Sequence, residues 1–346
     1  RRFMTLYTMA AKNHWILTIL LCLFTGIMTY SVTHCLQPNK NTDFPSSSND
    51  FNPHMNLVRE TRYKLIAPLL LADIDLPNQN YAPILEKGKS DIDSAKAAGY
   101  LTESAIYFRN LNDGSWIGHN EHMAFDPGSI LKLSILIGYM RWSEAQPGIL
   151  NSLVKFDKPI PNLPFQNIQG KSLQLGKTYS VRELIEFMIL ESDNQANAIL
   201  NSQLPTQYGL SVFSDLGIRT PDKNAKAFPM SAAELSRFLR SLYNSTYLNE
   251  RDSEWALNLL TKSRFGSGIR SGVPQDVTVA HKFGERGYQD SAIVEVHETA
   301  IIYQNGNPYL ITIMTKGTSR ESQIDLIRRI SSHTFNLVTA ANPATI

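Results

Sequence analysis

The longest apolar segment of the chain lies close to its beginning. From 15 to 32 the sequence reads WILTILLCLFTGIMTYSV, without a charged side chain. This length just reaches what a helix needs to cross the hydrocarbon core of a bilayer. Arg1, Arg2 and Lys12 precede the segment, and acidic residues occur only after it. The positive-inside bias therefore predicts one transmembrane helix, with residues 1–14 in the cytoplasm and the rest of the chain outside the cytoplasm.

Other interpretations of this segment are weaker. A buried core helix is disfavoured because the segment has no polar face. A cleaved signal peptide needs a small-x-small cleavage site, and none follows the apolar run. Cys35 could suggest a lipoprotein cysteine, but His34 before it is too large for that signal. Residues 33–60 are rich in Asn, Ser, Pro and Asp, which predicts a flexible tether between the membrane and a folded domain.

From residue 61 to 346 the pattern of apolar residues predicts that folded domain. Short segments near both ends of this region are typical of strands, and turn residues such as Asp113-Gly114 separate them. The predicted strands are 103–110, 116–118, 277–282, 292–298 and 309–314, the last two joined by a turn at 305–307, and helices are predicted within 81–98 and 321–338.

The centre of the domain is predicted to be helical. Asp126 and Pro127 are typical of a helix start, with Asp as the N-cap and Pro at the first helical position. The residues that follow, to about Tyr139, are apolar on nearly every face. A helix with this pattern must be buried on all sides, at the centre of the domain.

A second helical region follows the central helix. Ser180 and Glu183 have the spacing of a capping box for a helix that ends near residue 191, and a short helix over 195–202 comes next. The order of elements predicts an α+β domain. Its single antiparallel sheet is assembled from both ends of the chain, flanked by helices, with a helical subdomain inserted.

Charge and cysteine content exclude several classes of function. The 33 Lys and Arg residues nearly balance the 31 Asp and Glu residues, so no basic surface for nucleic acid is expected. The two cysteines, Cys22 and Cys35, lie in the first tenth of the chain, which excludes a disulfide framework or a thiolate metal cluster in the domain. His119 and His122 lack a third ligand nearby, and no metal or other cofactor is predicted.

The sequence Ser129-Ile-Leu-Lys132 at the start of the central helix is the first candidate for catalysis. Three residues are nearly one helical turn, so Lys132 lies on the same face as Ser129, one turn deeper. A lysine in apolar surroundings loses solvation of its charged form, which lowers its pKa and lets it act as a base on the serine hydroxyl. Free N–H groups in the first helical turn favour a developing oxyanion at Ser129.

Two further polar elements accompany this pair. Ser192-Asp193-Asn194 occupies the break between two helices. A purely structural interpretation is a polar turn in which Asp193 or Asn194 caps the next helix. Lys282 interrupts an apolar strand pattern and is followed by Phe283 and Gly284. A lysine at such a position is either an edge-strand residue or a side chain that points into a cleft.

Taken together and in this order, these elements resemble the serine β-lactamase and penicillin-binding protein superfamily, and they are closest to class A. That pattern is S-x-x-K, then S-D-N, then K-T-G, and the resemblance covers about residues 60–340. It implies a β-lactamase/transpeptidase-like fold. The implied substrates are small-molecule β-lactams or cell-wall peptides.

The resemblance also implies roles for individual residues. Ser129 would be the acylated nucleophile and Lys132 its base, Ser192 would pass a proton to the leaving nitrogen, and Asn194 would hold a side-chain amide of the substrate. Lys282 would supply positive potential for the substrate carboxylate.

The strand residues after Lys282 complete the implied site. Gly284 and Glu285 would border the substrate, and the backbone N–H groups of Ser129 and Glu285 would form the oxyanion hole. Arg270 is a further candidate for contacting a substrate carboxylate.

Two departures from class A bear on turnover. The loop over 217–230, where class A enzymes carry a deacylating glutamate, has Asp222 as its only acid. Phe283 stands where the family has a threonine that binds the substrate carboxylate.

Three functions therefore stay open at this point. The first is hydrolysis of β-lactams, and the second is a D-Ala-D-Ala carboxypeptidase or transpeptidase activity on cell-wall peptides. The third is a non-enzymatic binding module on a degenerate hydrolase fold.

Overall fold

A computed structural model describes residues 55–60, 65–74, 76–164, 170–222 and 227–341. The predicted cytoplasmic segment, the predicted membrane helix and most of the predicted tether lie outside the described residues. Within the described ranges, no helix is both long enough and apolar enough to cross a membrane.

The end of the predicted tether is a strand. β1 (Met55–Arg59) pairs antiparallel with β2 (Leu69–Ile74), so the ordered domain begins before residue 61 and the predicted boundary is wrong. The local composition is polar, and the strand forms through its tertiary partner. Leu70 and Leu71 of β2 are buried in the core, and Val58 of β1 packs against the same core.

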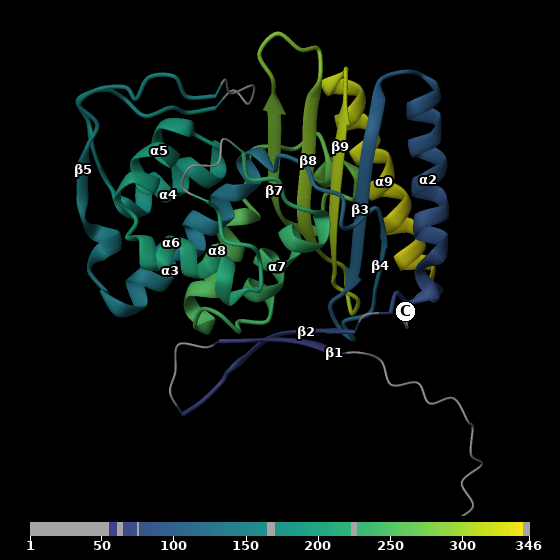
Figure 1. The fold of residues 1–346 in the computed structure, drawn as a ribbon, viewed down its shortest axis with the longest axis horizontal. Helices are drawn as coiled ribbons and strands as arrows, with labels where there is room; N and C mark the ends of the chain where they lie inside the picture. The colour runs from purple at the N-terminus through teal and green to yellow at the C-terminus, as the bar shows by residue number, and fades with distance from the viewer. Residues whose placement is uncertain (1–54, 61–64, 75, 165–169, 223–226, 342–346) are drawn as a thin grey trace, which may run out of the picture. The chain divides into compact units, whose positions relative to one another are not determined.

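A single five-stranded antiparallel sheet forms the centre of the domain, in the order β4-β3-β9-β8-β7. This confirms the sheet built from both ends of the chain, although the three late strands run further than predicted. The strands are β3 (Leu101–Asn110), β4 (Trp116–His119), β7 (Thr278–Gly287), β8 (Val294–Tyr303) and β9 (Tyr309–Gly317). β7 lies at one edge of this sheet, next to the helical subdomain (Figure 1).

Two helices from opposite ends of the domain cover one face of the sheet. Figure 1 shows α2 (Ala82–Ala97) beside α9 (Arg320–Ala341), both within about a turn of their predicted bounds. Apolar side chains of both helices form one buried cluster with the strands, including Ile92 of α2 and Ile327 of α9. This packing explains why segments more than two hundred residues apart in sequence form one layer.

The other helices form the inserted subdomain, and α3 (Lys132–Ala145) lies at its centre. Nine consecutive residues from Lys132 to Met140 are buried, as the all-round apolar pattern predicts. The predicted capping box is confirmed at α4, where Ser180 Oγ accepts from Glu183 N–H and Glu183 accepts from Ser180 N–H. The remaining helices are α4 (Val181–Leu190), α5 (Asn194–Gln203), α6 (Thr206–Asp215), α7 (Ala232–Tyr243) and α8 (Glu250–Leu260). A short strand pair joins the subdomain, β5 (Leu153–Lys155) with β6 (Thr178–Ser180).

Candidate active site

The turn that carries Ser129 is a 3-10 helix, η2 (Gly128–Leu131), and regular α-helix begins only at Lys132. The predicted α-helical start at Pro127 is therefore corrected. Asp126 still satisfies the turn, because its Oδ1 accepts the N–H of Gly128 at 3.1 Å. Residues three apart eclipse one another in a 3-10 helix, so Ser129 and Lys132 keep the shared face that the sequence predicts.

Two glycines allow this turn to lie directly against the edge strand β7. Gly128 has φ +52°, and a Cβ there would meet the carbonyl oxygen of Glu285 at 2.5 Å. A Cβ on Gly284 would meet the carbonyl oxygen of Pro127 at 2.4 Å. Only residues without a side chain permit these approaches. The backbone nitrogen of Glu285 is thereby held next to the nucleophile turn.

Lys132 is buried, with an exposed fraction of 3%, and its ammonium group faces the break between α4 and α5. Its Nζ donates to the backbone carbonyl of Ser192, to Ser192 Oγ at 3.2 Å and to Asn194 Oδ1 at 2.8 Å. The S-x-x-K and S-D-N elements therefore meet in space.

Lys282 contacts the same hydroxyl. It is 1% exposed, and its Nζ donates to Ser192 Oγ at 3.0 Å and to the carbonyl of Phe283 at 2.9 Å. The strand lysine therefore points into the site and not to solvent. Ser192 Oγ is within hydrogen-bond distance of the Nζ atoms of both lysines, which is the geometry of a proton relay.

Burial lowers the pKa values of both lysines, Lys132 and Lys282. Loss of solvation lowers the pKa of Lys132 well below its ordinary value, and the nearby charge of Lys282 lowers it further. Burial also lowers the pKa of Lys282 to about 7, although attraction from Glu298 and Glu285 opposes this effect. Two cations so close together disfavour each other, so Lys132 is the side chain that can accept a proton near neutral pH.

The backbone of Ser192 is unusual for a residue that is not glycine. Its φ of +54° lies in the left-handed region, which turns the hydroxyl between the two lysines. The next residue stabilises the turn, because Asp193 Oδ1 caps α5 by accepting the N–H of Ala196 at 2.7 Å. Asn194 Nδ2 donates to the carbonyl of Pro164 at 2.9 Å, and this bond holds the Asn194 side chain in place.

A cavity of about 210 Å³ joins most of the predicted site residues. Ser129, Ser192, Asn194 and Glu285 all line it, and Lys132 and Lys282 contact it through Ser192. We call this the catalytic cavity. Its other lining residues are Asp126, Gly128, Leu131, Leu163, Pro164, Asn197, Phe283 and Arg286.

The structure places Arg270 away from this cavity. Arg270 lies in the short helix η4 (Ile269–Gly272), and its guanidinium donates to the carbonyls of Pro274 at 3.0 Å and Gln275 at 2.7 Å. The guanidinium of Arg270 thereby supplies hydrogen-bond donors to backbone carbonyls of a loop, which has no regular secondary structure to supply them. Asp222 does not line the cavity either.

Arg286 is the cation that sequence reasoning missed. It lines the catalytic cavity, and its Nε lies 3.4 Å from Asp126 Oδ2. The signal was available, because Lys282, Gly284 and Arg286 alternate along β7 and so share one face of the strand.

Phe283 stands where the family carries a threonine, and the Phe283 side chain makes apolar contacts instead. Its ring stacks on Phe265, with centroids 3.7 Å apart and planes 22° apart. The guanidinium of Arg320 lies 5.8 Å from the same ring, and Arg320 Nε also bonds Glu285 Oε2 at 2.6 Å. The Phe283 side chain therefore belongs to the core beneath α9, and it offers no hydroxyl to a substrate.

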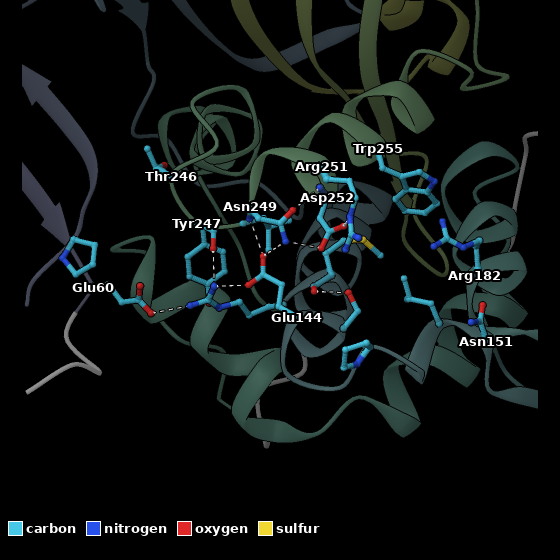
Figure 2. A pocket seen from close by; sticks show the side chains of 17 residues that line it. Glu60, Glu144, Asn151, Arg182, Thr246, Tyr247, Asn249, Arg251, Asp252 and Trp255 are labelled. Carbon is cyan, nitrogen blue, oxygen red and sulfur yellow. Dashed lines mark hydrogen bonds and ion pairs between the residues drawn. The ribbon is translucent and has the colours of Figure 1, made fainter.

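A larger cavity, of about 810 Å³, lies apart from these residues (Figure 2). Its charged groups bond one another: Arg141 donates to Glu60 at 3.2 Å and to Glu144 at 2.6 Å, and Glu144 accepts the N–H of Asn249 at 2.8 Å. None of the predicted catalytic residues lines it. Size alone would therefore have selected the wrong cavity for the chemistry.

Two comparisons relate the sequence itself to known proteins. A sequence profile described as "Beta-lactamase enzyme family" matches residues 89–338. A comparison with curated proteins gave no sequence match.

Several solved structures share the fold. A β-lactamase from Chitinophaga pinensis is 18% identical with a TM-score of 0.65, over 75% of this chain and 99% of that one. A class A β-lactamase from Mycobacterium abscessus is 21% identical with a TM-score of 0.59, over 72% and 98% of the two chains. PBP-A is 20% identical with a TM-score of 0.59, over 72% and 95%. At these identities the likeness shows the fold alone.

Proposed function

The chain belongs to the β-lactamase enzyme family, and we propose that it is a serine hydrolase that β-lactams acylate at Ser129. The observation that carries this proposal is the position of Ser192 Oγ, 3.2 Å from Lys132 Nζ and 3.0 Å from Lys282 Nζ. A buried lysine that has lost its proton beside a serine turn is the arrangement that nucleophilic catalysis needs. A site without catalytic function has no physical reason to bury two lysines.

In the proposed reaction, Ser129 Oγ attacks the lactam carbonyl carbon and its proton passes to the neutral Nζ of Lys132. The backbone N–H groups of Ser129 and Glu285 stabilise the oxyanion. When the C–N bond breaks, Ser192 Oγ gives its proton to the leaving nitrogen and receives one from Lys132. The products are an ester on Ser129 and a neutral amine whose N–H carries the transferred proton, and Lys132 is neutral again.

Deacylation has less support in the structure. Asp126 and Glu285 are the only carboxylates among the described residues lining the catalytic cavity. Asp126 lies 3.4 Å from Arg286 Nε, and Glu285 bonds Arg320 Nε at 2.6 Å. The nearby cation stabilises the ionised form of each carboxylate, and this makes the carboxylate a weaker base for removing a proton from water. We therefore expect a slow hydrolytic step, and this favours D-Ala-D-Ala carboxypeptidase or transpeptidase activity on cell-wall peptides as the second candidate function.

Intact-protein mass spectrometry with a penicillin, followed over time, tests the proposal. An adduct that forms and decays within minutes indicates β-lactam hydrolysis, and one that persists for hours indicates the peptidase type. Ser129→Ala is the control and should form no adduct. If the unsubstituted protein forms no adduct either, the proposed function is wrong and a binding module on this fold becomes the better explanation.

We also propose that residues 15–32 anchor the chain as a single-pass membrane protein, with the N-terminus cytoplasmic and the catalytic domain extracytoplasmic. The support is the uncharged apolar run and the basic residues before it. Protease added to intact spheroplasts should degrade the domain and spare a tag fused to the N-terminus. A protected domain would contradict this orientation.

A further inference from the structure

The strand β8 carries two buried polar side chains next to the turn that leads to Ser129. They are Glu295 and His297, with exposed fractions of 3% and 0%, and residues two apart in a strand share one face. His297 lies directly opposite Gly284 of β7, the glycine against which the turn packs. The proposed acylation uses neither side chain. Burial of polar groups costs free energy unless they form hydrogen bonds, so their partners indicate their role.

Both side chains contact the backbone of Asp126. Glu295 Oε2 accepts the N–H of Asp126 at 2.8 Å, and His297 Nε2 lies 2.9 Å from the carbonyl oxygen of Asp126. We call this pair of contacts the Asp126 clamp. Burial would raise the pKa of Glu295, but the contacts with His297 and Tyr288 outweigh it and hold the pKa below its ordinary 4.5. Glu295 is therefore an ionised acceptor near neutral pH.

The hydrogen-bond partners of His297 define which ring nitrogen carries the proton. A backbone N–H can only donate, and the nitrogen of Thr315 lies 3.2 Å from Nδ1, so Nδ1 is an acceptor without a proton. A carbonyl oxygen can only accept, so Nε2 carries the proton and donates to Asp126. Two independent contacts therefore indicate the same tautomer. The imidazole connects β9, through Thr315, to the residue that precedes Pro127.

Few free dihedral angles separate the Asp126 clamp from the nucleophile. Bonds to both its N–H and its C=O fix the peptide groups on either side of Asp126. The ring of Pro127 fixes the next φ, and the N–H of Gly128 donates to Asp126 Oδ1 at 3.1 Å. The N–H of Ile130 then donates to the carbonyl of Pro127 at 3.1 Å. The position of Ser129, which lies within this segment, therefore depends on the clamp.

We propose that Glu295 and His297 are positioning residues, which hold the backbone of Asp126 and thereby keep Ser129 Oγ in place to attack the substrate carbonyl. The inference rests on the proposed acylation at Ser129 and adds two residues that act on it through the chain. His297 does not line the catalytic cavity. Its loss should therefore lower the rate of the acylation step and leave substrate binding nearly unaltered.

Two substitutions that each keep one half of the imidazole's hydrogen bonding test this role. In His297→Gln the side-chain amide nitrogen reaches the position of Nε2 and can donate to Asp126. In His297→Asn the shorter side chain places its oxygen at the position of Nδ1, where it can accept only from Thr315. Both variants lose the aromatic ring and its edge contact with Phe125, so they differ mainly in the bond to Asp126.

Acylation of the full chain by a penicillin is followed by mass spectrometry over a range of penicillin concentrations. His297→Asn should lower the maximal acylation rate by about a hundredfold, because a displacement of about 1 Å has that effect on a positioned reaction. His297→Gln should recover most of this loss, because it keeps the bond to Asp126. The concentration that gives half the maximal rate should change by less than about twofold in both variants.

Asn110→Ala is the control for lost stability. Asn110 is buried and donates to Tyr81 at 2.9 Å and to Asn307 at 2.7 Å, and it does not line the catalytic cavity. Its loss should destabilise the fold and leave the acylation rate normal. Thermal unfolding identifies the variants that fold. Equal rates for folded His297→Gln and His297→Asn would overturn the positioning role, and so would a slow, folded Asn110→Ala.

The other half of the clamp gives a second pair of variants. Glu295→Gln keeps an oxygen that can accept the N–H of Asp126, whereas Glu295→Met, of similar length, removes it. Glu295→Gln should therefore be acylated much faster than Glu295→Met. This pair decides the question if the His297 variants do not fold, and equal rates in the folded pair would overturn the clamp.

Magnetic resonance separates this inference from the proposed function. In the full chain with nitrogen-labelled histidine, the His297 ring should give the signals of an imidazole protonated at Nε2, and a proton on Nδ1 would overturn the inference. With carbonyl-labelled glycine and nitrogen-labelled serine, the amide signal of Ser129 should shift more in His297→Asn than in His297→Gln. These two results would support the clamp even if no penicillin acylates Ser129. Equal shifts of the Ser129 amide in the two variants would contradict it whatever the acylation assay shows.

Discussion

At the scale of single residues, the hydroxyl of Ser192 is the group on which the site depends. It is the shared acceptor for the Nζ atoms of Lys132 and Lys282, and its backbone is held at φ +54°. The left-handed conformation costs a residue with a Cβ roughly 1–2 kcal/mol. Function and stability therefore oppose each other at this residue.

Two substitutions at Ser192 separate these effects. Ser192→Ala and Ser192→Gly both remove the proton relay, and we expect each to slow acylation about a hundredfold or more. Ser192→Gly removes the backbone strain as well, so it should be about 1 kcal/mol more stable than Ser192→Ala. Acylation kinetics and urea unfolding measure the two quantities. Equal stability of the variants, or acylation at the normal rate, would contradict this account.

The pKa of Lys282 gives a second prediction, for stability against pH. Its folded-state pKa of about 7 lies below the ordinary 10.5, so between these values the unfolded chain binds more protons than the folded chain. Folding stability should therefore rise with pH across this window, by on the order of 1 kcal/mol per unit for this group. Below about pH 7 both states bind the proton and the cost of burial is fully present.

Urea unfolding of the unsubstituted protein and of Lys282→Met, from pH 6 to pH 10, measures this contribution. The difference between the two free energies of unfolding should shift in favour of the unsubstituted protein as pH rises above 7. Parallel curves would show that Lys282 keeps its charge throughout and that burial does not lower its pKa.

At the scale of elements, the contact between η2 and β7 places the nucleophile. Gly284→Ala adds a methyl group 2.4 Å from the Pro127 carbonyl, and the turn must move away from the strand. A displacement of about 1 Å can slow a positioned reaction roughly a hundredfold, and we expect a loss of that order in acylation. Gly287→Ala on the same strand is the matched control, since a Cβ there meets nothing within 4 Å. Similar rates for the two variants would show that this contact does not position Ser129.

Local patterns predicted the elements whose signals are local. The all-round apolar run of α3, the capping box of α4 and the turn at Gly306 follow from neighbouring side chains, and each is found where expected. β1 was missed because it forms only through β2 and the core, with nothing distinctive in its own composition.

The site residues likewise divide into those that the sequence predicts and those that depend on tertiary structure. Spacing within one helical turn relates Ser129 to Lys132. The order of three motifs along the sequence, which resembles that of the superfamily, identifies Ser192 and Lys282. Which arginine reaches the cavity is a question of tertiary structure, and there sequence reasoning chose Arg270 while the structure places Arg286 at the wall.

At the scale of the whole molecule, one carboxylate joins three parts of the fold. Asp73 of β2 bonds Arg240 of α7 at 2.6 Å and Arg109 of β3 at 3.0 Å, and Arg237 of α7 lies 3.8 Å away. Burial would raise the pKa of Asp73, but the three guanidinium groups outweigh it and hold the pKa below its ordinary 3.8. The hairpin, the sheet and the helical subdomain therefore share one ionic centre.

Asp73→Asn should destabilise the domain by roughly 3 kcal/mol at pH 7, because it leaves partly buried guanidinium groups without a counter-charge. Asp325→Asn is the matched control. Asp325 also bonds two arginines, Arg328 and Arg329, but its side chain is 51% exposed, so the change should stay within about 0.5 kcal/mol.

The dependence on pH distinguishes charge from shape at Asp73. A carboxyl whose pKa is lowered by folding contributes its stability fully above its unfolded value and loses it as pH falls through the folded value. The advantage of the unsubstituted protein over Asp73→Asn, measured by thermal unfolding, should therefore be constant near neutrality and shrink below pH 3.8. Asn has the size of Asp and does not titrate, so a difference that persists at low pH would come from altered packing. In that case the link between β2, β3 and α7 would be steric and not ionic.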